Sequence, residues 1–330
     1  PELQSVFIFD ASSTVSQLTA LDKRINMMQG VEYDKVKRFS NCNLIQHTQF
    51  SASKDALNLR AKQKTHMQPI LDEVIEQILD TPRDKALLIC TAKRRKGRSD
   101  DHSGFIAHLY EYLDANVKGW EDQTITHDGE ELPRFNVIHW GQHRATSAYR
   151  HCSVILAIGV LRRRIDELQA TASGQLEDLE HPTLDQQGFI RYVQKCESFT
   201  CVQQLFGRGT ARIIDNGQAL PCTMHLWDND NYRDTQGPND AKEDLITRAL
   251  PDIQYHNERG ALGKVIDELV AVLEAQPRSV RKLSAVAWCK ASPLFQELTY
   301  KDQMTLVRAE ALRLLCGTWV NESRSVIRAN

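Results

Sequence analysis

The sequence QQLFGRGTAR, residues 203–212, places two arginines and a glutamine around glycine residues. The preceding segment has the apolar spacing of a helix, so this cluster lies where a helix is predicted to end. A guanidinium held in place stabilises a phosphate most where negative charge grows during bond breaking. These residue types at this spacing therefore favour phosphate chemistry, with the candidate residues Gln204, Gly207, Arg208 and Arg212.

Three more arginine-bearing segments follow predicted strands: residues 91–101, 141–150 and 159–164. The carboxyl ends of parallel strands lie at one edge of a sheet, so we expect the three loops to lie together there. Such loops suit sequence-independent contact with nucleic-acid phosphates, and an aromatic ring there suits base stacking. The residues expected to make these contacts are Lys93, Arg94, Arg95, Arg144 and Tyr149. For the run KRRKGR, residues 93–98, a solvated surface loop remains the alternative, and for Arg162–Arg164 the start of a surface helix is favoured.

Strand-like and helix-like segments alternate along the first 235 residues. Apolar runs predict strands at 6–14, 85–93, 135–140, 153–160 and 221–227, with an edge strand or hairpin at 36–50. Helical periodicity marks 65–79, 104–117 and 190–206, whereas polar residues 166–185 indicate a surface insertion. This alternation predicts an α/β fold with a mostly parallel sheet between helices.

Beyond about residue 251 the pattern becomes helical. Helices are predicted at 262–275, 276–289 and 301–316, followed by a strand at GTWV, residues 317–320. Residues 277–330 carry nine basic and four acidic side chains, a local excess of +5. A small helical domain over 240–330 fits these features, either as a helix-turn-helix or winged-helix module or as a plain helical cap.

Composition sets broad limits. A length of 330 residues favours two domains, and a net charge of −2 does not by itself indicate nucleic-acid binding. The eight cysteines are expected to be buried free thiols, because Cys196 and Cys201 have no second pair at zinc spacing. His139 and His143 are four residues apart with His151 nearby, but no acidic partner is close in sequence, so no metal site is predicted. Without an apolar run of about 18 residues or a leader, the chain is expected to be cytoplasmic.

Several segments, in order, resemble motifs of superfamily 2 DNA/RNA helicases of the phage and plasmid type. QQLFGRGTAR is similar to the sixth motif, glutamine-x-x-glycine-arginine-x-x-arginine, except that the second arginine is one place late at Arg212. FDASST at 9–14 resembles the motif that ends the first motor domain, and LLICTAK at 87–93 resembles the fourth motif. HWGQHRATSAYR at 139–150 and SVILAIGVLRR at 153–163 follow in the expected order.

This resemblance implies a second RecA-like motor domain over residues 25–235, preceded by the end of a first domain or a linker at 1–24. It implies that Arg208, helped or replaced by Arg212, acts as an arginine finger on ATP. Gln204 and Gly207 would contact the nucleotide. Nucleic acid, and DNA in preference to RNA, would be the partner.

The sequence contains no G-x-x-x-x-G-K-[ST] phosphate loop. The resemblance therefore implies that ATP and Mg²⁺ are held mainly by a first RecA-like domain upstream in the same polypeptide, and that the chain alone does not hydrolyse ATP. The alternative function is a non-catalytic nucleic-acid-binding protein that uses the basic loops and the C-terminal module.

Overall fold

A computed structural model describes residues 37–48, 57, 68–93, 105–143, 146–175, 187–233, 235–236, 242–258, 268, 282–283, 292–293, 296, 319–322 and 325–328. Two compact units divide the chain. The first extends to His256, and the second comprises residues 47–49 and everything from Asn257 onward.

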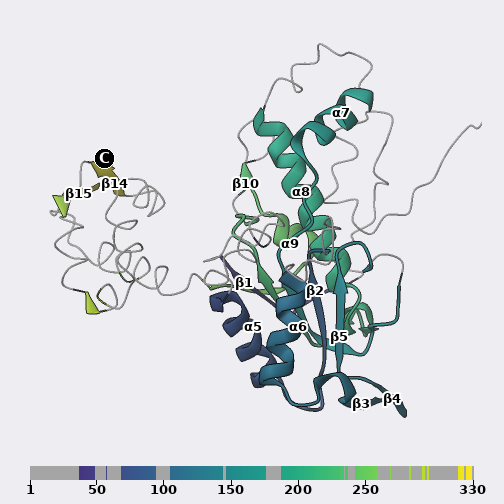
Figure 1. The fold of residues 1–330 in the computed structure, drawn as a ribbon. Helices are drawn as coiled ribbons and strands as arrows, with labels where there is room; N and C mark the ends of the chain where they lie inside the picture. Colours follow the sequence, from purple (N-terminus) through teal and green to yellow (C-terminus); the bar gives the residue numbers. More distant parts are fainter. Residues whose placement is uncertain are drawn as a thin grey trace, which may run out of the picture. The chain divides into compact units, whose positions relative to one another are not determined.

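A six-stranded, mostly parallel sheet forms the centre of the first unit (Figure 1). Its strand order is β12-β1-β9-β6-β2-β5. β2 pairs in parallel with both β5 and β6, and β6 pairs in parallel with β9. The strands are β1 (Cys42–His47), β2 (Ala86–Thr91), β5 (Phe135–His139), β6 (Cys152–Ile158), β9 (Cys222–Trp227) and β12 (Gln254–Glu258).

Helices cover both faces of this sheet. β2 is buried at every position, as expected of a central parallel strand, and its successive side chains alternate between two cores. Leu87 and Ile89 pack with α5 (Gln68–Asp80) and α6 (Phe105–Asn116), which lie side by side in Figure 1. Leu88 and Cys90 pack in the other core with α8 (Gln187–Phe206) and α9 (Leu245–Ala249).

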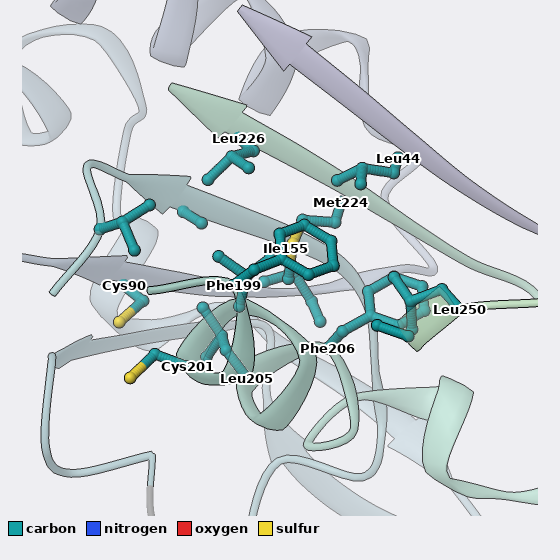
Figure 2. Close-up of a cluster of buried hydrophobic side chains, with 14 of the residues drawn as sticks. Leu44, Cys90, Ile155, Phe199, Cys201, Leu205, Phe206, Met224, Leu226 and Leu250 are labelled. Atoms are coloured by element: carbon teal, nitrogen blue, oxygen red, sulfur yellow. The ribbon is translucent and has the colours of Figure 1, made fainter. Parts of the chain in front are cut away.

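The apolar face of α8 provides much of that second core. Figure 2 shows Phe199, Leu205 and Phe206 against side chains of the strands. Phe199 and Phe206 are fully buried, and each such burial contributes about 1.5–3 kcal/mol to stability. This packing fixes the carboxyl end of α8, where the two arginines follow, against the sheet.

Short elements connect these layers. Two hairpins, β3 (Thr124–His127) with β4 (Glu130–Pro133) and β7 (Ile214–Asp215) with β8 (Gln218–Ala219), turn through two residues each. Asp128–Gly129 and Asn216–Gly217 all have positive φ, as a tight hairpin turn requires. The remaining pieces are the 3₁₀ turns η2 (Trp120–Asp122) and η3 (Thr210–Arg212), the helix α7 (Ile165–Gln175), and the two-residue strands β10 (Thr235–Gln236) and β11 (Lys242–Glu243).

The α/β fold with a mostly parallel sheet is confirmed, as are helices α5, α6 and α8 and strands β2, β5, β6 and β9. The expectation of an edge strand at 36–50 was wrong. β1 is not an edge strand, because β12, whose polar sequence QYHNE gave no strand signal, lies outside it. α7 covers 165–175 at the start of the predicted surface insertion, 166–185, and its described side chains are mostly exposed, as expected of a surface segment. The predicted strand at 6–14 lies outside the described residues.

Three short strands are described in the second unit: β13 (Lys282–Leu283), β14 (Trp319–Glu322) and β15 (Ser325–Arg328). They form an antiparallel sheet in the order β13-β15-β14. β14 overlaps the strand predicted at 317–320. Residues 282–283 are extended, so the helix predicted over 276–289 was wrong there. Within the described ranges of the whole chain, no helix is long and apolar enough to cross a membrane.

Candidate functional site

The two arginines lie where α8 ends and turns toward β7. The N–H of Gly207 donates to the Gln203 carbonyl at 3.0 Å, and that of Arg208 donates to Leu205 at 2.9 Å, closing the last helical turn. η3 then carries Arg212, whose N–H donates to the Gly209 carbonyl at 3.0 Å. The carboxyl end of a helix carries a partial negative charge that interacts favourably with cations. An arginine directly after α8 is therefore favoured by the helix itself.

A single carbonyl brings both guanidinium groups together. Nη1 of Arg208 donates to the Thr146 oxygen at 2.9 Å, and Nη1 of Arg212 donates to the same oxygen at 3.2 Å. Thr146 belongs to the connection between β5 and β6. Two segments that the sequence analysis singled out, 139–150 and 203–212, therefore meet at this point.

The two arginines have different environments. Arg208 is partly buried, and its Nε is buried with no hydrogen-bond partner among the described residues. Burial, and then the positive charge of Arg212, lower the pKa of Arg208 from its ordinary value. Arg212 is exposed. Among the residues that the structure describes, neither guanidinium pairs with a carboxylate. The pair can therefore accept an anion without breaking an ion pair.

Gly209 is the glycine that the local packing requires. A Cβ on Gly209 would lie 2.6 Å from the carbonyl oxygen of Cys152 and 3.1 Å from Cδ1 of Ile155. The loop thus rests directly on the start of β6, with no room for a side chain. At Gly207 the nearest atom to an added Cβ is 3.6 Å away, which is ordinary contact. Sequence reasoning selected Gly207 by motif and missed Gly209, since the close approach depends on a strand far earlier in the chain.

The residues predicted to contact nucleic acid do not all lie at one edge of the sheet. Lys93 is exposed and follows the carboxyl end of β2. Tyr149 is partly buried against the core and precedes the amino end of β6, where its carbonyl accepts from Cys152 N at 2.9 Å. Cys152 pairs with Ala86 at the start of β2, and Gly209 lies against Cys152. Tyr149 and residues 207–212, which we call the arginine loop, therefore lie near the opposite end of the sheet from Lys93, roughly 20 Å away along the strand. The expectation that the whole segment 141–150 lies at the carboxyl edge was therefore wrong.

Of the other predicted site residues, one lies on α8 and three lie outside the described residues. Gln204 is partly buried on the last turn of α8, one turn before Arg208. Arg94, Arg95 and Arg144 lie outside the described residues.

The carboxyl edge holds a buried polar network that sequence reasoning did not identify. Arg162, just after β6, pairs with Asp228 and, with 2.9 Å between Nη2 and Oδ2, with Asp230 after β9. Tyr232 donates to Asp228 at 2.5 Å, and Gln46 Nε2 donates to the carbonyls of Asp228 and Asp230 at 2.8 and 2.7 Å. Burial alone would lower the pKa of Arg162, but the negative charge of Asp228 and its neighbours outweighs it, so the net shift is upward.

This network ties together the ends of β1, β6 and β9. Arg163 pairs with Glu197 at 3.0 Å and Arg164 with Asp166 at 2.7 Å, so each arginine of 162–164 has a carboxylate partner. These pairs support a structural role for the run. A signal was present in the sequence: the acidic residues of WDND directly follow a predicted strand.

The histidines do not converge. His139 Nδ1 lies 3.0 Å from the Trp140 oxygen, His143 Nδ1 accepts from Gly141 N at 3.2 Å, and His151 Nε2 lies 3.2 Å from the Pro133 oxygen. In the part of the chain that the structure covers, no three His, Cys, Asp or Glu side chains are placed to hold a metal. The six cysteines described, including Cys196 and Cys201, are buried thiols outside any disulfide, as expected.

Comparison with protein-family models, curated proteins and solved structures finds no match to this chain. The function is therefore argued from the described side chains and the fold.

Proposed function

We propose that this chain is the second motor half of an ATP-dependent nucleic-acid helicase or translocase, with a RecA-like first unit. The observation that carries the proposal is the arginine pair after α8. Arg208 and Arg212 converge on one carbonyl, and neither has a carboxylate partner among the described residues. Such a pair suits an anionic group that arrives from outside the domain.

Arg208 is the better arginine finger of the two. Its stem is partly buried and its Nη1 is anchored at 2.9 Å, so it needs little reorganisation to meet a developing charge. The γ-phosphate of ATP develops such charge on its equatorial oxygens during transfer. Arg212, which is exposed, acts as helper, and Gln204 with Gly207 contacts the nucleotide from the last turn of α8. A first RecA-like domain supplies the phosphate loop and the Mg²⁺ ligands.

Nucleic acid, in this proposal DNA, binds through Lys93, Arg94, Arg95, Arg144 and Tyr149. The exposed position of Lys93 after β2 supports a phosphate contact at the carboxyl edge. Lys93 lies at the opposite end of the sheet from the arginine pair, whereas Tyr149 lies near the pair, so a bound nucleic acid would follow the sheet between its two ends. Closure of the two motor halves on ATP and their opening after hydrolysis then move the strand contacts.

Turnover of a protein that joins this chain to its first motor domain tests the proposal. Arg208→Ala is expected to lower kcat about 10³-fold, as loss of an arginine finger does, with KM for ATP changed far less. Arg164→Ala is the matched control, because Arg164 is exposed and paired with Asp166. It is expected to leave kcat within about twofold.

Arg212→Ala shows which arginine acts on the phosphate. A larger loss with Arg212→Ala than with Arg208→Ala would assign the finger to the later residue. If both variants fold and turn over ATP like the unchanged protein, the motor function is refuted.

A second candidate function is nucleic-acid binding without catalysis, and the sheet of the second unit favours it. β14 and β15 form a hairpin with only residues 323–324 between them, and β13 pairs with the far side of β15. A strand-plus-hairpin sheet next to predicted helices is the arrangement of a winged-helix module.

This second function predicts that single-stranded DNA binding by the 330-residue chain falls steeply with salt. The triple change of Lys93, Arg94 and Arg95 to Ala should reduce the log–log slope by roughly 0.7 for each phosphate that is no longer bound.

A further inference from the structure

Lys37 lies next to the arginine loop, although it is far from it in sequence. Its Nζ lies 4.8 Å from the centroid of the Phe39 ring, which in turn lies 5.8 Å from the ring of Phe206. Phe206 is the last residue of α8, two residues before Arg208. The lysine ammonium thus lies over an aromatic ring that packs against the same helix end that positions the arginines.

Backbone hydrogen bonds also join the residue after Lys37 to the β7–β8 hairpin, which follows the arginine loop. Arg38 N donates to the Gly217 carbonyl at 3.0 Å, and Ala219 N donates to the Arg38 carbonyl at 2.9 Å. Arg38 is thereby bridged in parallel to Gln218 on β8. The β7–β8 hairpin begins two residues after Arg212, so Lys37 enters alongside the turn that carries the second arginine.

These contacts place Lys37 beside the loop that carries Arg208 and Arg212. Burial lowers the pKa of Lys37, the nearby Cys42 and Cys222 partly oppose this shift, and the charge of Arg212 adds a smaller lowering. Within the described residues none of Lys37, Arg208 and Arg212 forms an ion pair. Arg38, directly next to Lys37, does have a carboxylate, with its Nε 3.8 Å from Asp252. Like charges that lie together without a counter-charge repel one another, and a bound anion removes that repulsion.

We propose that Lys37 completes a binding site for a terminal phosphate group together with Arg208 and Arg212, as a third cationic ligand. This inference rests on the proposed function for the identity of its occupant, the polyphosphate of a nucleoside triphosphate. Lys37 comes from the segment before β1, so the site draws on three separate parts of the chain: the entry to β1, the β5–β6 connection at Thr146 and the end of α8. The two guanidinium groups donate directional hydrogen bonds to the phosphate, and the ammonium adds a third positive charge.

Calorimetric titration of the 330-residue chain with inorganic tripolyphosphate tests the site. Lys37→Met keeps an apolar stem over Phe39 and removes the charge. It is expected to weaken tripolyphosphate binding about tenfold, the effect of removing one charge-assisted hydrogen bond. Arg38→Met, the matched control, removes the same charge one residue away and should weaken binding less than about twofold. Lys37→Arg keeps the charge and should retain most of the affinity.

Equal weakening by Lys37→Met and Arg38→Met would show only a general effect of charge and overturn the site. Absence of tripolyphosphate binding by the unchanged chain would also overturn it. If Lys37→Met does not fold, Lys37→Gln replaces it under the same criteria, and binding by a folded Lys37→Gln protein at full affinity refutes the proposal. A single-stranded oligonucleotide that competes with tripolyphosphate, with loss of both in Lys37→Met, would assign the site to backbone phosphates and refute the nucleotide occupant.

These outcomes are separable from failure of the proposed function. The motor function is judged by turnover of Arg208→Ala in the joined protein, whereas the phosphate site is judged by binding to this chain alone. A chain that binds tripolyphosphate through Lys37 but whose joined form is insensitive to Arg208→Ala retains the site and loses the motor.

Discussion

At the scale of single residues, the position of the arginine loop depends on Gly209, where only a residue without a side chain fits. Gly209 lies so close to the Cys152 carbonyl that an added Cβ would approach it to 2.6 Å. We expect Gly209→Ala to lower the free energy of unfolding by about 1–3 kcal/mol, because backbone atoms on both sides must shift. Urea unfolding followed by circular dichroism measures this change.

Gly207→Ala is the matched control for that variant. Its Cβ would meet nothing closer than 3.6 Å, and Gly207 has no positive φ, so an alanine fits. We expect a change within about 0.5 kcal/mol. If the two alanine variants unfold at the same urea concentration, the close approach at Gly209 does not constrain the loop.

At the scale of elements, the ends of three strands are held by the buried network around Arg162. Asp228 is fully buried, and its carboxylate depends on Arg162 and Tyr232. Arg162→Met leaves this carboxylate without its cation, so we expect a loss of about 3 kcal/mol in the free energy of unfolding. Chemical denaturation of the purified variant gives the value.

Arg164→Met serves as the comparison, because the Arg164–Asp166 pair is 76% and 64% exposed. Its loss should stay below about 1 kcal/mol. Adding Asp228→Asn to Arg162→Met should recover part of the stability, since no buried charge is then left unpaired. A double variant as unstable as the sum of the two single variants would show that the pair is not coupled.

At the scale of the whole molecule, the stability of the first unit depends on pH through a core histidine. Burial lowers the pKa of His225 from 6.5 to about 4, so the folded protein keeps this side chain neutral while the unfolded chain takes up a proton. Well above the unfolded pKa of 6.5 both states are neutral and no penalty applies. As the pH falls from 6.5 toward 4, the unfolded state binds more protons and stability is lost.

Between about pH 7.5 and about pH 5 we expect His225 to account for a loss of about 2 kcal/mol in the free energy of unfolding. His225→Gln cannot bind the proton, so urea unfolding of this variant at the two pH values should show a correspondingly smaller change than the unchanged protein. A variant with the same pH dependence as the unchanged protein would contradict this assignment.

Local patterns in the sequence were sufficient for most of the first unit. The uninterrupted apolar run of β2 and the helical spacing of α5 and α8 were read correctly, because burial on both faces of a parallel strand and on one face of a helix leaves a periodic signature. β12 left none, since its sequence QYHNE is mostly polar and its side chains are mostly exposed. The hairpin turns Asp128–Gly129 and Asn216–Gly217 did carry a signal, the two dipeptides typical of such turns.

By itself, the sequence determined that Arg208 and Arg212 lie close together, because four residues at the end of a helix cannot separate far. Only the tertiary structure decided what joins them. Thr146 lies 62 and 66 positions away from the two arginines, and Lys37 lies farther still. The physical reason is the topology of parallel strands. Each crossover returns the chain to the same end of the sheet, and which strands then become neighbours depends on how the two cores pack, which no local pattern records.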